Sequence, residues 1–284
     1  MADTSVFGAP GRVTLPDGRR LYHVSQGEGE PVVVLEAGLG GSRADWGLVL
    51  AGIATSTKVV AYDRAGLGRS DPDTARRDVG RMAEDLGHLL DGLGAERYLL
   101  VGHSLGGPII RAYAARHPAR VAGLVLIDPA DETLDMYYSL KHRLLVRGIC
   151  LAMELLSRAG YRKLPGGSRA AELFPPEMRA EAEPELTSPG SLRASRAEAT
   201  ALADGLRELR AAPGTLPPVP VTVISGALSR SRGEAARHDD LVAAHRAFAE
   251  SLPHGRHVMA ERSGHMIQQD QPNIVIEEIL RLLP

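Results

Sequence analysis

Short runs of β-branched and other apolar residues recur along this chain and alternate with segments of helical periodicity. Several of the runs are apolar throughout, which is typical of strands buried on both faces of a sheet. The runs occupy residues 21–24, 32–35, 58–62, 98–101, 121–127, 219–225 and 256–260. The helical patterns occupy residues 79–93, 105–117 and 274–283. This alternation predicts an α/β fold with a mostly parallel sheet covered by helices on both faces.

The alternation stops between about residue 130 and residue 218, where no run is typical of a strand. Apolar residues at helical spacing predict two amphipathic helices here, over residues 137–153 and 192–209. The segment is too long for a plain loop, so we expect a helical cap above the edge where the strands end. A partly disordered linker rich in Arg, Glu and Ala is the alternative, which the apolar first half disfavours. The expected domains are a core over 1–130, a cap over 131–217 and the rest of the core over 218–284.

Composition narrows the class of protein further. The chain has 284 residues, a formal net charge of −2 and no basic stripe, which argues against nucleic acid as a partner. No run approaches the roughly 20 apolar residues of a membrane span, and the N-terminal residues lack the pattern of a signal peptide. The single cysteine, Cys150, cannot form an intrachain disulfide. We therefore expect a cytoplasmic protein that acts on a small molecule, with its oligomeric state left open.

A serine at a sharp turn is the strongest candidate for catalysis. The segment Gly102-His103-Ser104-Leu105-Gly106-Gly107 directly follows a predicted strand and precedes a predicted helix. The pattern G-x-S-x-G alone is weak, but this context is typical of a nucleophile turn. Glycines on both sides let the backbone pass, and the amides at the helix N-terminus favour negative charge. We expect Ser104 to be the nucleophile; the alternative is a glycine-rich turn with an incidental serine.

Two further segments supply what a serine nucleophile needs. The hydroxyl requires a base, and His265 lies on the loop after the last apolar run, downstream of the serine. Acyl transfer also requires N–H donors for the oxyanion of the tetrahedral intermediate. We assign these to the backbone amides of Leu105 and of Leu39, which lies in a glycine-rich loop. His254 and His257 have no metal-ligand partners at suitable spacing, so we expect neither a metal nor an organic cofactor.

Four motifs together resemble the α/β-hydrolase superfamily. They are Gly38-Leu39-Gly40, the stretch from Asp63 to Ser70, the segment from Gly102 to Gly107, and Ser263-Gly264-His265. The resemblance covers both flanks of the chain, over about residues 20–130 and 218–284. It implies a mostly parallel eight-stranded sheet flanked by helices, with a helical cap inserted after the sixth strand. We expect Asp63 and Arg64 to hold loops by charge-assisted hydrogen bonds rather than to act in catalysis.

The acid that would orient His265 departs from the pattern of most relatives. There it follows the seventh strand, a few residues past a glycine, where this chain has Ser229. Some relatives carry the acid after the sixth strand, which makes Asp128 the best candidate. Its alternative role is to start a turn before Pro129. The weaker candidates are Asp131, Glu132, Glu234, Asp239 and Asp240, of which the last two are expected instead to cap a helix over 241–252.

These residues predict a serine hydrolase that cleaves a carboxylic ester or related acyl bond through an acyl-Ser104 intermediate. Apolar residues of the cap are expected to line the entrance for a hydrophobic small molecule; they are Tyr137, Leu140, Leu144 and Met153. The epoxide-hydrolase and dehalogenase branches resemble this chain but use aspartate at position 104, so the serine disfavours them. Lactonase, thioesterase, amidase, carbon–carbon hydrolase, lyase and perhydrolase reactions stay open, as does a non-catalytic small-molecule receptor on the same fold.

Overall fold

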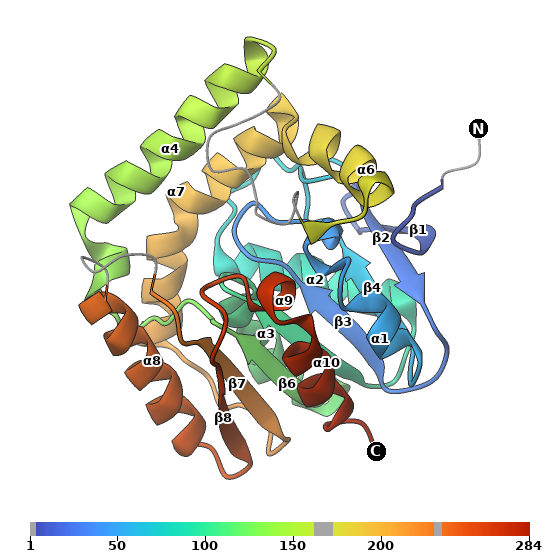
Figure 1. Cartoon of the computed structure of the whole chain (residues 1–284), viewed down its shortest axis with the longest axis vertical. Helices are drawn as coiled ribbons and strands as arrows, with labels where there is room; N and C mark the ends of the chain where they lie inside the picture. Colours follow the sequence, from blue (N-terminus) through green and yellow to red (C-terminus); the bar gives the residue numbers. More distant parts are fainter. Residues whose placement is uncertain (1–3, 162–172, 230–234) are drawn as a thin grey trace.

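The computed structural model describes residues 4–161, 173–229 and 235–284. Within them the chain forms an eight-stranded sheet in the order β1-β2-β4-β3-β5-β6-β7-β8 (Figure 1). β2 is antiparallel to both of its neighbours, and all the other pairs are parallel. The strands are β1 (Ala9–Thr14), β2 (Arg20–Gln26), β3 (Val32–Glu36), β4 (Val59–Tyr62), β5 (Tyr98–His103), β6 (Val121–Ile127), β7 (Val221–Gly226) and β8 (Gly255–Ala260). The mostly parallel eight-stranded sheet expected from the sequence is thereby confirmed.

β1 is the one strand that the apolar runs did not predict. It contains Pro10 and Gly11, and Val13 is its single buried residue. Proline cannot donate a hydrogen bond to a sheet, so it is tolerated mainly at an edge, and β1 is the edge strand next to β2. This segment is a strand because it pairs antiparallel with β2, and its own sequence has no apolar pattern that would predict one.

Helices cover both faces of the sheet. One face carries α2 (Val79–Leu93), α3 (Gly106–Arg116) and α8 (Ala235–Glu250), and the other carries α1 (Leu50–Ala54), α9 (Ile267–Asp270) and α10 (Pro272–Leu280). Adjacent residues of a strand point to opposite faces, so Val32 and Val34 of β3 pack in the first core and Val33 and Leu35 in the second. The unbroken apolar runs are explained by this double burial. Single 3₁₀ turns lie at η1 (Arg43–Trp46) and η2 (Pro118–Arg120).

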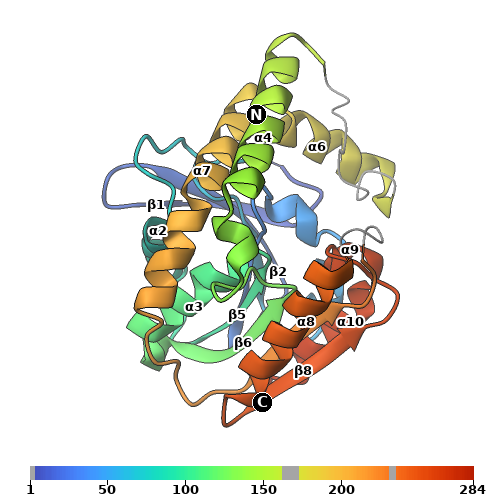
Figure 2. The same ribbon diagram turned by 90° about the vertical axis from the view of Figure 1, so that its left-hand side faces the viewer.

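Between β6 and β7 the chain forms a helical insertion. It contains η3 (Asp135–Tyr138), α4 (Leu140–Arg158), α6 (Pro176–Leu186) and α7 (Pro189–Ala211). α7 packs on α2 and α3 of the core, and α4 packs on the outer side of α7 (Figures 1 and 2). The helix predicted over 192–209 lies within α7, whereas the one predicted over 137–153 is divided, because the Ser139 side chain caps α4. α6 was not predicted, since Pro184 lies inside it and its apolar residues form no stripe.

No helix in the three described ranges is long and apolar enough to cross a membrane. The cytoplasmic location and the division of the chain into core and cap stay predictions. The sequence Pro165-Gly166-Gly167 predicts a turn, and these residues lie outside the described ranges.

Candidate active site

Ser104 lies at the turn between β5 and α3, with a backbone φ of +51°. This left-handed conformation is uncommon for a residue with a side chain, and the surrounding structure must impose it. The flanking glycines make the turn possible. A Cβ on Gly102 would lie 2.6 Å from the Gly106 carbonyl, and a Cβ on Gly106 would lie 2.3 Å from the Glu36 carbonyl oxygen. The predicted strand–turn–helix context of Ser104 is therefore present.

Asp128 shares this conformation, with a φ of +41° directly after β6. Ser104 and Asp128 are the two residues other than glycine that have a positive φ in the described part of the chain. The turns that carry them are joined: the Ser104 amide donates to the Ile127 carbonyl, and the Ala130 amide donates to the Ser104 carbonyl, both at 3.0 Å. Strained residues cluster at functional sites, so the two turns mark one site at the carboxyl ends of β5 and β6.

Asp128 and His265 form a short hydrogen bond. His265 Nδ1 lies 2.7 Å from Asp128 Oδ2, and the Gly226 amide donates to Oδ1 at 3.3 Å. Burial by itself would raise the pKa of Asp128, but the hydrogen bond and charge of His265, followed by the charges of His245 and His103, hold it below its ordinary value. The carboxylate is therefore ionised and accepts a hydrogen bond from Nδ1–H, which directs Nε2 of the ring toward the role of acceptor.

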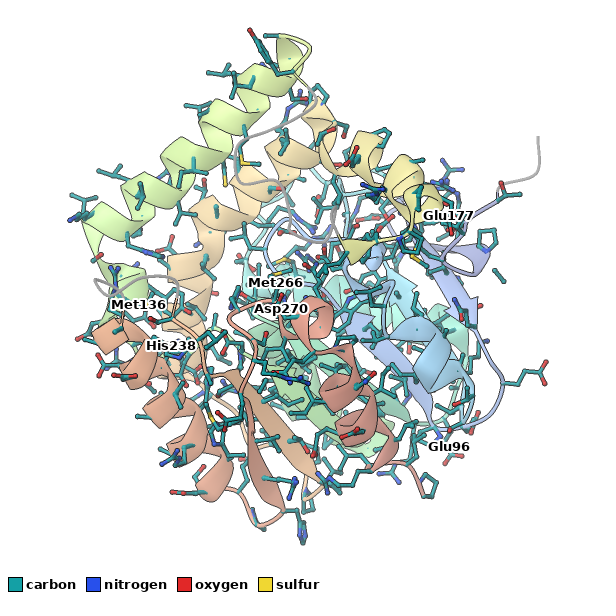
Figure 3. All side chains as sticks on the ribbon, in the orientation of Figure 1. Glu96, Met136, Glu177, His238, Met266 and Asp270 are labelled. Atoms are coloured by element: carbon teal, nitrogen blue, oxygen red, sulfur yellow. The ribbon has the colours of Figure 1, made fainter. Side chains whose placement is uncertain are left out.

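Ser104 and His265 are both described, and no hydrogen bond joins the serine hydroxyl to the imidazole. In free enzymes such bonds are often long and shorten only when substrate is present. The His265 side chain is 33% exposed, so its free edge is accessible. Met266, the next residue along the chain, marks this region in Figure 3, below the helical insertion.

The other candidate acids lie elsewhere or are already paired. Glu132 forms a two-pronged ion pair with Arg111, at 2.6 and 2.8 Å, and the Asp131 carboxylate accepts the Thr133 amide at 2.8 Å. Asp239 and Asp240 are exposed on α8. That helix begins at Ala235 rather than near 241, so they lie inside it and the prediction that they cap it is wrong. Glu234 lies outside the described residues.

His103 holds the loop that carries His265, a role that the motif did not predict. Its Nε2 lies 2.9 Å from the His265 carbonyl oxygen, which can only accept, so Nε2 carries the proton. The two rings lie 4.6 Å apart between centroids. Burial, and then the nearby His265, lower the pKa of His103 to about 3. His103 is therefore a neutral donor.

A second histidine braces the turn after Asp128. His245 of α8 lies with Nε2 2.8 Å from the Pro129 carbonyl oxygen, so Nε2 donates and Nδ1 accepts from the Ser225 hydroxyl at 2.8 Å. Ser225 in turn receives a hydrogen bond from His257 Nε2 at 2.9 Å. Donor and acceptor are thus determined for each of these three hydrogen bonds. The described residues contain no group of three His, Cys, Asp or Glu side chains placed to hold a metal ion.

Arg64 organises the loop after β3. It is buried, and all five of its N–H donors are used. Nη1 donates to Glu36 and to the Ala37 carbonyl, and Nη2 donates to the Gly38 carbonyl, at 2.6 to 2.7 Å. Nε and Nη2 also bind the two oxygens of Glu198 at 2.8 Å each. The predicted loop-holding role of Arg64 is confirmed, and so is that of Asp63, which accepts the backbone amides of Arg43 and Arg69.

Glu198 connects this loop to the insertion. It lies on α7, and its Oε2 accepts the Gly40 amide at 2.9 Å in addition to Arg64. The contact fixes the residue directly after Leu39. The backbone N–H groups of Leu39 and Leu105 donate to no acceptor among the described residues, so both are available to a ligand. Nothing in the sequence pattern indicated Glu198, because it lies far from its partners along the chain.

The four insertion residues expected at the substrate entrance do not lie together. Tyr137 is half-buried, and burial, followed by the negative charges of Asp128 and Asp131, raises its pKa. Leu140 and Leu144 differ from the expectation: they are 68% and 58% exposed on the outer side of α4. The inner side of that helix, which faces α7, carries Cys150, Glu154 and Ser157. Met153 is half-buried.

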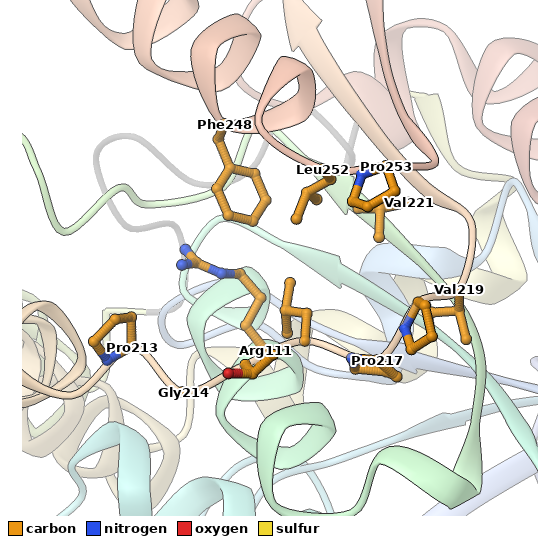
Figure 4. A pocket seen from close by; sticks show the side chains of 12 residues that line it. Arg111, Pro213, Gly214, Pro217, Val219, Val221, Phe248, Leu252 and Pro253 are labelled. Carbon is orange, nitrogen blue, oxygen red and sulfur yellow. The ribbon is translucent and has the colours of Figure 1, made fainter.

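A separate cavity of about 360 Å³ lies between α3, α8 and the segment that enters β7 (Figure 4). Its walls include Leu216, Val219, Phe248 and Leu252. Its charged lining residue, Arg111, stacks over the Phe248 ring at 4.3 Å and is neutralised by Glu132. Ser104, Asp128 and His265 are not among its lining residues, so this cavity is distinct from the candidate site.

Comparison with known proteins shows which family part of this chain resembles. A family model described as the alpha/beta hydrolase fold matches residues 30–146. A protein named "Putative carbamate hydrolase RutD" from Azorhizobium caulinodans is 34% identical over 129 residues, which are 44% of this chain and 48% of the relative. The chain spans less than half of the length of the curated relatives that it matches.

Solved structures match over nearly the whole chain. One described as "Epoxide hydrolase CorEH without ligand" aligns with a TM-score of 0.74 and 24% identity, over 96% of this chain and 97% of the other. A thermophilic esterase from Thermogutta terrifontis aligns with a TM-score of 0.71 and 22% identity, over 96% and 97%. At these identities the likeness shows the fold. Together with the family match over residues 30–146, it shows that this chain has the alpha/beta hydrolase fold.

Because His103 is buried, we expect the free energy of unfolding to depend on pH in the acid range. Its ordinary pKa of 6.5 applies to the unfolded chain, which therefore binds more protons than the folded protein between pH 6.5 and about 3. The free energy of unfolding must fall as the pH falls through this window, by about 3 kcal/mol between neutrality and about pH 4. Urea unfolding across this range should show a shallower decline for His103→Gln than for the wild type. The exposed His254→Gln serves as control, and parallel curves for His103→Gln and wild type would contradict the prediction.

Proposed function

We propose that this protein is a hydrolase that cleaves a carboxylic ester or a related acyl bond through a covalent intermediate on Ser104. The observation that carries the proposal is the hydrogen bond between His265 Nδ1 and the buried Asp128 carboxylate, beside a strained serine at a helix N-terminus. A base that is oriented by an acid, next to a serine hydroxyl, is the arrangement that makes the serine nucleophilic.

In the proposed reaction Ser104 Oγ attacks the carbonyl carbon while His265 Nε2 takes its proton. Asp128 stabilises the imidazolium that forms and keeps the ring in the required tautomer. The free backbone amides of Leu39 and Leu105 donate to the oxyanion. His265 then protonates the leaving group, and a water activated by the same base hydrolyses the acyl-enzyme.

The names of similar proteins support an acyl substrate. Carbamates and esters both present a carbonyl carbon bonded to a heteroatom, and these words occur in the names of a relative and of a neighbour in fold. The structure described as an epoxide hydrolase supports the fold alone. We further propose that the insertion acts as a cap and that Tyr137 faces a hydrophobic small-molecule substrate. Met153 contributes less directly to the binding of this substrate. Other acyl chemistry and lyase or perhydrolase reactions on the same residues are the alternatives.

Replacement of the nucleophile tests the mechanism. Ser104→Ala should lower kcat on a panel of p-nitrophenyl esters of increasing acyl length by about a thousandfold or more, because no acyl-enzyme can form. Ser251→Ala, which makes the same chemical change at an exposed position, should leave kcat unaltered. Activity that survives in Ser104→Ala would exclude the mechanism. A wild type that turns over no ester would favour the lyase or receptor alternatives.

Replacement of the acid tests its assignment. Asp128→Asn should lower kcat by about a hundredfold to ten-thousandfold with little change in fold, since an amide no longer enforces the tautomer of His265. Asp239→Asn, an exposed position on α8, is the matched control. Steady-state kinetics on the best ester measures both. If Asp128→Asn retains the rate of the wild type, Asp128 is not the acid.

Glu198 offers a test of the oxyanion loop. Glu198→Gln removes the charge that holds Arg64 and loosens the bond to the Gly40 amide, so the Leu39 amide loses its support. Donors to the oxyanion act in the transition state, so kcat should fall about tenfold or more while KM changes little. Glu208→Gln is the control, because this glutamate lies on the same helix and its side chain is 60% exposed. A rise in KM alone would contradict this role.

A further inference from the structure

α4 carries an apolar face that the described residues of this chain leave exposed. Six of the ten large hydrophobic side chains that are exposed in the described part of the chain lie on this helix. They are Leu140, Leu144, Leu145, Ile149, Leu151 and Leu155, each between 44% and 68% exposed. Exposed apolar residues are common singly, but a contiguous set marks a surface of interaction.

The spacing of four of these six residues brings them to one side of the helix. At about 100° per residue, Leu140, Leu144, Leu151 and Leu155 fall within roughly 60° of one another. The opposite side is anchored to the insertion: Ser157 donates to the Thr187 carbonyl at 2.5 Å, and Glu154 binds Arg196 at 2.8 Å. α4 therefore lies along the outer edge of the molecule (Figures 1 and 2). The leucines of this face are exposed.

The accessible charges on α4 are all positive. Lys141, Arg143 and Arg147 form no ion pair within the three described ranges. The acidic residue of the helix, Glu154, is buried and bound to Arg158 and Arg196. The accessible surface of α4 thus combines leucines with cations and presents no carboxylate. A second copy of the chain on this face would bring like charges together, whereas an anionic surface would complement them.

We propose that α4 is a docking surface for a bilayer that contains anionic lipids. The leucine face enters the boundary between headgroups and acyl chains, and Lys141, Arg143 and Arg147 bind lipid phosphates. A helix of this kind lies in the plane of the interface, which is compatible with the absence of a membrane-spanning helix from the described residues. The proposal does not depend on the proposed hydrolysis, because it concerns binding alone.

Co-sedimentation of the full chain with vesicles tests this surface. We expect binding to vesicles of equal parts phosphatidylcholine and phosphatidylglycerol, and about tenfold weaker binding to phosphatidylcholine alone at low salt. Leu144→Glu with Leu151→Glu should weaken binding about a hundredfold. The double variant replaces two apolar side chains with negative charges, which the anionic lipids repel. Both side chains are exposed, so the melting temperature should stay that of the wild type.

Two double variants that remove the same amount of positive charge distinguish binding through α4 from attraction by the overall charge of the protein. Lys141→Gln with Arg147→Gln should weaken binding about tenfold, while Arg97→Gln with Arg116→Gln, which removes two exposed cations elsewhere, should not. Absence of binding to the mixed vesicles overturns the proposal, as does binding that the leucine variant retains. Sedimentation velocity tests whether two copies of the chain associate through this face. If the wild type forms a dimer that the leucine variant abolishes, and does not bind vesicles, the face is an interface between copies. That result would overturn lipid docking.

Discussion

The buried guanidinium of Arg64 joins three parts of this protein that lie far apart in the sequence. A charge removed from water is stable only where carboxylates and carbonyls compensate for the lost hydration. Arg64 finds these in Glu36 at the end of β3, in the loop that follows, and in Glu198 of α7. Because moving α7 would separate Glu198 from Arg64 and from the Gly40 amide, the inner helix of the insertion is bound to the core. α4, which packs on the outside of α7, lies beyond this constraint.

The candidate site depends on the meeting of two strained turns. Parallel neighbours end at the same edge of a sheet, so the residues after β5 and β6 lie side by side, and hydrogen bonds between them hold Ser104 and Asp128. An acid on β6 needs support from β7, and the Gly226 amide provides it. The buried His245 fixes the adjacent Pro129 carbonyl. The position of Asp128 directly after β6 is therefore accompanied by a polar network that includes β7 and α8.

Sequence patterns predicted those elements whose own residues carry the signal. α2 coincides with its predicted bounds, because a stripe of buried apolar residues from Val79 to Leu90 requires a helix. The central strands were predicted since both their faces are buried. β1 and α6 were missed because pairing and packing with other segments, rather than apolar periodicity, give them their structure. Among polar residues, Ser104 and His265 were predicted from their places between elements, whereas His103, His245 and Glu198 act through partners that are distant along the chain.

The sequence by itself determined the parallel sheet, the turn at Ser104 and the order of the candidate serine and histidine, because each follows from local periodicity and glycine placement. The tertiary structure decided which carboxylate contacts His265, since that depends on the order and register of strands rather than on spacing. It also decided that the leucines of α4 face solvent. Helical periodicity shows that a helix has an apolar face, but packing alone determines whether the protein covers it.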